Sequence, residues 1–238
     1  MAAIGTAAPD PLCDHGVSDD HAPAAPPAAP TATRKDLQLG RRLFHLTNGV
    51  VIATAYALLF THQQVVHLFG TIACLVYILD RVRIHYPGVL QRAPRVNDLF
   101  FRAEEQLKES AMTPYAIAIL LTLITFPKPI ALIATYTLAI ADPLSAVVGI
   151  TWGRRQVVPD KSVEGSAAFF AATAAVSIAV LRWATAAALL PLVGAAVLIG
   201  LAAALFEMLP VRLDDNLTIP LFVGFAGWIV CDLLGVTV

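Results

Sequence analysis

The sequence predicts an all-α protein: a polytopic membrane bundle of about seven transmembrane helices with a cytoplasmic N-terminus. Of its 238 residues, 58% are hydrophobic and only 14% are charged, whereas about 25% charged residues are usual in a soluble domain. The apolar residues gather in segments long enough to cross a bilayer. The basic residues gather in alternate connections between these segments, which gives the bundle a direction.

Residues 1–33 are expected to form a disordered tail. They are rich in Ala and Pro and contain no Lys or Arg, a composition that cannot bury enough apolar surface to fold. They also lack the basic stretch and apolar core of a secretory signal. We therefore expect an integral membrane domain over residues 34–238.

Apolar length predicts the helices in order. A spanning helix needs about 20 mainly apolar residues, because the hydrocarbon layer is about 30 Å thick. Seven segments approach this length: 43–60, 64–80, 112–127, 128–149, 166–182, 186–209 and 217–236. Pro127, Pro129 and Pro191 mark breaks or kinks. The count depends on the third segment, which is the shortest.

The distribution of basic residues predicts the orientation. Cytoplasmic connections retain Lys and Arg, and only Lys128 and Arg182 of the sixteen basic residues fall outside one set of alternate connections. Since alternate connections share a side, this pattern favours seven spans over six or eight. It predicts that the N-terminus is cytoplasmic and the C-terminus is outside.

Asp142, near the end of the fourth segment, is the first candidate functional residue. A carboxylate within hydrocarbon costs about 2.5–3.5 kcal/mol on insertion scales, so such a residue is expected to face a polar cavity and to serve function. The alternative is a buried Asp bonded to neighbouring hydroxyls beside the Pro143 kink.

The connection before the fifth segment combines cations with small residues. Helix N-termini and cations bind polyphosphates, and the residues of this kind are Gly149, Gly153, Arg154, Arg155, Lys161, Gly165 and Ser166. The alternative is that Ser162 or Asp160 caps the fifth helix and that the cations only fix the topology.

The connection before the seventh segment carries Asp214, Asp215 and Asn216. Their oxygens are ligands of the kind that Mg²⁺ takes beside substrate phosphates, and Glu207 adds a carboxylate on the same side. The alternative is that Asp215 or Asn216 caps the seventh helix.

Two further stretches are weaker candidates. Arg42 and His45 lie on one stripe as the first helix enters the membrane, where His45 could contact phosphate or orient a hydroxyl. Glu104, Glu105, Lys108 and Glu109 have helical spacing, which an interfacial amphipathic helix explains.

In combination, four motifs resemble the family of CTP-dependent lipid kinases that contains dolichol kinase, phytol kinase and the CTP-using diacylglycerol kinase. That family is related to the phosphatidate cytidylyltransferases. The motifs are Arg41-Arg42-Leu43-Phe44-His45, Asp142-Pro143-Leu144-Ser145-Ala146 with Gly149, Lys161-Ser162 with Glu164-Gly165-Ser166, and Asp214-Asp215-Asn216 with Ile219-Pro220. The resemblance runs from about Arg41 to Leu234. Ala141 stands where the family more often has Gly.

The resemblance implies transfer of the γ-phosphate of CTP to the hydroxyl of a membrane lipid alcohol, with Mg²⁺. Under this hypothesis Asp142, Asp214 and Asp215 bind Mg²⁺ or activate the hydroxyl, and Lys161 with Arg154 or Arg155 contacts the phosphates. Ser162, Gly165 and Ser166 form a backbone cradle, Glu164 holds metal or orients Lys161, and Asn216 contacts metal or nucleotide. Arg42, His45 and Glu207 are secondary positions.

Two alternative functions remain compatible with the sequence. A cytidylyltransferase would use the same nucleotide, metal and membrane setting but would make a CDP-lipid. A transporter would use Asp142 and the Pro-broken helices as an ion site near the membrane midplane. The expected partners are the lipid alcohol, CTP and the bilayer, and no nucleic acid is expected.

Overall fold

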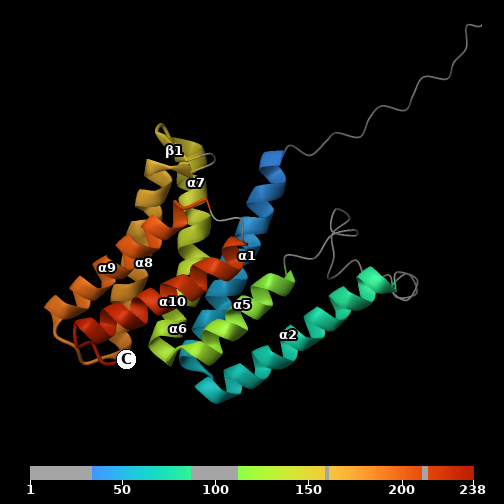
Figure 1. Ribbon diagram of the computed structural model, residues 1–238, viewed down its shortest axis with the longest axis horizontal. Coiled ribbons are helices and arrows are strands. Elements are labelled where there is room, and N and C mark those ends of the chain that lie inside the picture. The colour runs from blue at the N-terminus through green and yellow to red at the C-terminus, as the bar shows by residue number, and fades with distance from the viewer. Residues whose placement is uncertain (1–33, 87–111, 159–160, 211–213) are drawn as a thin grey trace, which may run out of the picture.

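The computed structural model describes residues 34–86, 112–158, 161–210 and 214–238 (Figure 1). The predicted tail and the predicted interfacial helix that includes Glu104, Glu105, Lys108 and Glu109 lie outside these ranges. Within them the chain is mostly helical, as predicted. The side chains of Arg42 and His45 are also outside the described part of the molecule.

Each of the seven predicted segments coincides with helical chain. The helices are α1 (Arg34–Leu58), α2 (His62–His85), α5 (Met112–Thr125), α6 (Lys128–Tyr136), the π-helix η2 (Thr137–Ala141), α7 (Asp142–Trp152), α8 (Val163–Ala184), α9 (Leu189–Glu207) and α10 (Asp215–Leu233). Because α6, η2 and α7 follow one another without interruption, they form the fourth segment. A short antiparallel pair of strands, β1 (Gln156–Val158) and β2 (Lys161–Ser162), was not predicted.

Five helical stretches of the described chain are long and apolar enough to cross a membrane. Two others, Leu46–Leu58 and Thr113–Thr125, are apolar but shorter. The chain therefore has the helices of a membrane protein, and five of them meet the length criterion without further argument.

The helices begin where local chemistry favours a start. Thr61 and Gln64 form a capping box before α2, in which each side chain bonds the other residue's amide. The predicted break at Pro127 is confirmed, because α5 ends at Thr125 and Pro127 is the N-cap of α6. Pro191 lies in the first turn of α9, where its missing N–H breaks no helical hydrogen bond.

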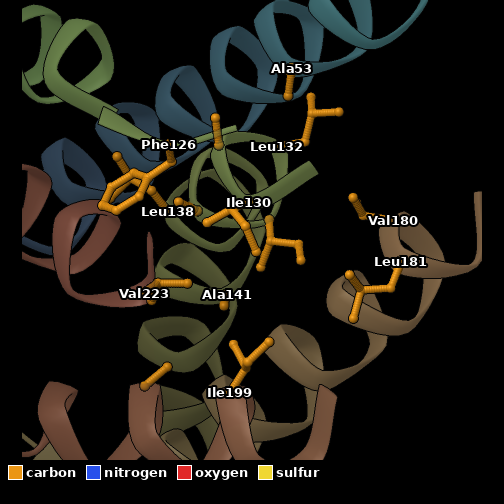
Figure 2. Close-up of a cluster of buried hydrophobic side chains, with 14 of the residues drawn as sticks. Ala53, Phe126, Ile130, Leu132, Leu138, Ala141, Val180, Leu181, Ile199 and Val223 are labelled. Atoms are coloured by element: carbon orange, nitrogen blue, oxygen red, sulfur yellow. The ribbon is translucent and has the colours of Figure 1, made fainter. Parts of the chain in front are cut away.

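The fourth segment is the centre of the bundle. Of its most apolar window, 67% is buried, against 22–39% for the other spanning helices. Ile130 and Leu138 from this segment share one buried cluster with Val223 of α10 and Ile199 of α9, and Leu132 lies beside Ala53 of α1 (Figure 2). A polar residue on this segment is therefore surrounded by other helices.

Close contacts fix how α1 runs against the central segment. A Cβ on Gly49 would come within 2.5 Å of the Ala139 Cβ, so the two backbones meet there. At the other end of the segment, the Lys128 ammonium donates to the carbonyls of Ala57 and Phe60 at 3.2 Å. The two helices are antiparallel, and α1 begins at the same end of the bundle as α7 ends (Figure 1).

Candidate functional site

Asp142 lies where the central segment changes its winding. η2 is a π-helix of five residues, and the Asp142 N–H donates to the Thr137 carbonyl five residues earlier. Such wide turns are rare and are frequent at functional sites. The Ser145 hydroxyl donates to the Asp142 carbonyl at 2.9 Å, and the Asp142 side chain is partly buried.

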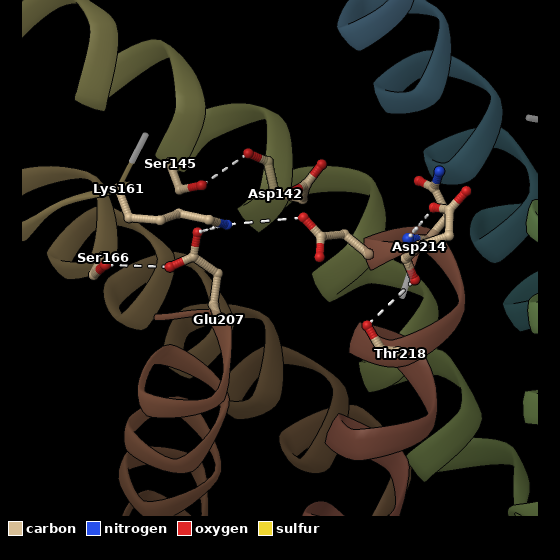
Figure 3. A network of polar contacts seen from close by, with 9 residues as sticks. Asp142, Ser145, Lys161, Ser166, Glu207, Asp214 and Thr218 are labelled. Carbon is tan, nitrogen blue, oxygen red and sulfur yellow. Dashed lines mark hydrogen bonds and ion pairs between the residues drawn. The ribbon is translucent and has the colours of Figure 1, made fainter. Parts of the chain in front are cut away.

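Lys161 approaches the same region from a distant part of the sequence. It lies on β2, directly before α8, and its Nζ is 2.5 Å from Glu207 Oε1 and 3.8 Å from Asp215 Oδ2 (Figure 3). The negative charge of Asp142 also acts on this ammonium. We call Lys161, Glu207, Asp215 and Asp142 the Lys161 cluster.

Glu207 is the most buried carboxylate of the Lys161 cluster. It ends α9, its side chain is 4% exposed, and its second oxygen, Oε2, accepts a hydrogen bond from the Ser166 hydroxyl at 3.2 Å. A buried carboxylate needs both a cation and hydrogen bonds to offset its lost hydration. Lys161 and Ser166 supply them, one to each oxygen.

Lys161 remains a cation in this environment. Burial lowers its pKa, but the hydrogen bond to Glu207 and the charges of Glu207, Asp215 and Asp142 together raise it above its ordinary value of about 10.5. The ammonium is therefore protonated throughout the physiological pH range, and its side chain is 28% exposed. An anion arriving from solvent can reach a permanent positive charge at this point.

The turn between α7 and α8 is held by Glu164. Its Oε2 accepts the backbone N–H of Arg154 at 3.1 Å and that of Arg155 at 3.4 Å. Both arginine side chains are exposed. Glu164 thus orders the segment that carries the two predicted phosphate-binding arginines, and it is not among the groups that contact Lys161.

The small residues of this region bring α7 and α8 together. The Ser162 hydroxyl accepts the Gly165 N–H at 3.1 Å and caps α8, which was one of the two caps considered from the sequence. A Cβ on Gly165 would lie 2.9 Å from the Ser145 carbonyl oxygen, so only glycine fits without displacement. The Ser162 cap already uses the Gly165 amide, which the predicted phosphate cradle would offer.

The start of α10 corrects one expectation. Asp214, and neither Asp215 nor Asn216, is the N-cap, because its Oδ1 accepts the Asn216 N–H at 2.9 Å. The register of the cap was wrong because three consecutive residues of similar capping preference precede the apolar run. Capping leaves Asp215 in the first turn, where it faces Lys161 and stays 55% exposed.

The structure joins some predicted residues and leaves others apart. Lys161, Ser166, Asp215 and Asp142 come together, and Glu207 is central to them although the sequence indicated only a secondary role. Among the described residues, no group of three or more His, Cys, Asp or Glu side chains is arranged to hold a metal ion. The predicted Mg²⁺ ligand set of Asp142, Asp214 and Asp215 therefore stays a prediction.

One buried carboxylate was not among the sequence candidates. Asp80, on α2, is 1% exposed, and it accepts a hydrogen bond from the Thr113 hydroxyl of α5 at 3.2 Å. An acidic residue within an apolar run was the signal that could have found it. The bond joins α2 to α5.

Comparison with known proteins gives two distant relatives. An uncharacterized protein of Rickettsia prowazekii is 28% identical over 192 residues, which cover 78% of this chain and 91% of that protein. An uncharacterized protein of Methanocaldococcus jannaschii is 27% identical over 196 residues, which cover 79% and 91%. No family model and no solved structure matches the chain. The function is therefore argued from the site itself.

Proposed function

We propose that the protein is a membrane kinase that transfers the γ-phosphate of CTP to the hydroxyl of a lipid alcohol. The observation that carries this proposal is the Lys161 cluster, in which four ionisable residues from four separate elements meet at one end of an apolar bundle. The CTP specificity and the acceptor class come from the resemblance of the four sequence motifs.

The chemistry of the Lys161 cluster suits phosphoryl transfer. This reaction depends mainly on positioning and on stabilising charge that is spread over phosphate oxygens. Lys161 supplies a partly exposed, permanent cation, and Glu207 holds it in place from the buried side. In this proposal the phosphates of the nucleotide take the exposed side of Lys161, where Asp215 now lies.

The donor set also fits a magnesium ion that arrives with the nucleotide. Three carboxylates act on a single ammonium, and Mg²⁺ is usually bound by one or two carboxylates together with substrate phosphates and waters. Asp142 and Asp215 would hold it, with Asp214 kept in its capping role. When bound, the ion would neutralise phosphate charge, and in this proposal Asp142 orients or deprotonates the acceptor hydroxyl.

We also propose that the end of the bundle with the Lys161 cluster faces the cytoplasm. Arg154, Arg155 and Lys161 lie at this end, whereas Lys128 and Arg182 lie at the other, and cytoplasmic ends carry the excess of Lys and Arg. This orientation, with seven spans, would let cytosolic CTP meet an alcohol dissolved in the bilayer.

The test is product analysis with purified protein in lipid nanodiscs. Polyprenol, dolichol, phytol and diacylglycerol are each incubated with Mg²⁺ and with CTP, UTP, ATP or GTP. The proposal expects a lipid monophosphate and CDP, with CTP preferred. Release of pyrophosphate and formation of a CDP-lipid would instead identify a cytidylyltransferase, and no nucleotide consumption with any acceptor would reject both enzymes.

A further inference from the structure

Three buried hydroxyl groups of the described chain have no hydrogen-bond partner. They belong to Thr137, Thr173 and Ser177, and each of these residues is 0% exposed. Hydroxyls in membrane helices usually bond the carbonyl four residues earlier. Thr122 and Thr135 do so, at 2.7 and 2.8 Å. The three hydroxyls thus differ from the usual arrangement within the same molecule.

The packing of the helices places the Thr137 and Thr173 hydroxyls at one depth. α7 and α8 are antiparallel, and Gly165 meets the carbonyl of Ser145 at their contact. Thr137 lies eight residues before Ser145, and Thr173 lies eight residues after Gly165, so both are about 12 Å from that contact along their helices. Ser177 follows Thr173 by one turn.

The stripe that carries two of the hydroxyls begins at Ser166, which contacts the Lys161 cluster. Ser166, Thr173 and Ser177 are separated by seven and four residues, which puts them on one face of α8. Ser166 donates its hydrogen bond to Glu207 at 3.2 Å. Thr173 and Ser177 therefore lie on the same face of α8 as Ser166, with the buried Phe169 between them and Ser166.

We propose that Thr137, Thr173 and Ser177 form an internal site for bound water. A buried water molecule typically makes about three hydrogen bonds to otherwise unpaired groups, which matches three hydroxyls. The ligand must be small, must both donate and accept, and needs no charge, because none of the three side chains is charged. Water meets these requirements.

The π-helix explains why water is needed at this depth. Thr137 begins η2, where the backbone bonds five residues apart, so the wider turn moves its neighbours out of the regular register. A buried hydroxyl left unpaired is unfavourable, and the hydrocarbon offers no partner. Water at this site supplies the partner that the helices do not, whatever reaction the protein performs.

The test compares hydroxyl positions by water-to-protein magnetisation transfer in solid-state NMR. Threonine-labelled protein in bilayers is measured, and Thr137→Val, Thr173→Val and Thr135→Val assign the signals. We expect rapid transfer from water to Thr137 and Thr173 and slow transfer to Thr135, which is buried and bonded to Ala131. Equal, slow transfer to all three threonines would overturn the proposal.

Thermal unfolding gives a second measurement that does not depend on the first. If water bridges the hydroxyls, Thr173→Val leaves the buried water one hydrogen bond short and lowers the unfolding temperature more than Thr135→Val does. Thr173→Ser keeps the hydroxyl, so its unfolding temperature should fall less. If Thr173→Val instead raises the unfolding temperature, the hydroxyl was dry and the site does not hold water.

Discussion

Glu207→Gln should destabilise the protein markedly, because it removes the charge that balances Lys161 while keeping the shape of the side chain. Removing one partner of a fully buried pair costs about 3–5 kcal/mol, and a hydrogen bond to a charged group contributes about 1.5–3 kcal/mol. Lys161 is 28% exposed and keeps Asp215 at 3.8 Å, so solvent and the second carboxylate reduce the loss. We therefore expect Glu207→Gln to lower the free energy of unfolding by about 2 kcal/mol.

For a chain of this length, a loss of about 2 kcal/mol lowers the unfolding temperature by roughly 4–8 °C. The assay follows reaction of the buried Cys231 thiol with a fluorogenic maleimide during heating, because Cys231 is 0% exposed when folded. Cys13 and Cys74 are first replaced by Ser, since Cys74 is exposed. The fluorescence then rises only when unfolding exposes Cys231.

Asp215→Asn is the matched control, because it also removes one carboxylate next to Lys161. Asp215 is 55% exposed and its oxygen is 3.8 Å from the ammonium, and such surface pairs contribute about 0–1 kcal/mol. Its unfolding temperature should therefore fall less than that of Glu207→Gln. If both variants unfold at the wild-type temperature, or if Asp215→Asn is the less stable, Glu207 is not the anchor of Lys161.

Four further outcomes are expected. Gly165→Ala should lower the free energy of unfolding by about 1–3 kcal/mol, because its Cβ would lie 2.9 Å from a carbonyl oxygen of α7. The control Gly194→Ala, whose Cβ would have its nearest neighbour at 3.7 Å, should unfold at or above the wild-type temperature. Ser162→Ala should lower the free energy of unfolding by about 0.5–2 kcal/mol, because the α8 cap is lost. Ser162→Thr should restore part of this stability. The pKa of Lys161 is raised in the folded protein, so its contribution to stability is complete below about pH 10.5 and is lost only as the pH rises through the higher folded pKa. The difference in unfolding temperature between wild type and Glu207→Gln should therefore be constant from pH 6 to 9. Chelation of Mg²⁺ should abolish lipid phosphorylation and added Mg²⁺ should restore it, and turnover in excess EDTA would reject the metal requirement.

Sequence patterns predicted the helices well because each depends on a local property. Apolar length located the segments, and Pro127 correctly separated the third helix from the fourth. The π-helix before Asp142 could not be predicted, because its residues, Thr137–Ala141, are as compatible with an ordinary α-helix and only packing against neighbouring helices decides between the two windings. The strands β1 and β2 were also missed, because two or three residues carry no periodicity.

The sequence predicted which residues gather at the Lys161 cluster better than it predicted how they are arranged. The motifs identified Asp142, Lys161 and Asp215, which the fold brings together. The central position of Glu207 depends on α9 packing against α8 through Ser166, a tertiary contact with no local signature. Asp214 caps α10 through Oδ1, a position that adjacent acidic residues do not reveal, and its predicted metal role stays a prediction.

The most direct test of the central claim is whether Asp215→Asn is stable but inactive. Its rate of CTP-dependent lipid phosphorylation is measured beside Lys161→Ala and beside Arg182→Ala, which removes an exposed cation at the opposite end of the bundle. If the Lys161 cluster performs the transfer, Asp215→Asn and Lys161→Ala lose about 100-fold or more in turnover, while Arg182→Ala retains it. Wild-type turnover by Asp215→Asn and Lys161→Ala would contradict the account.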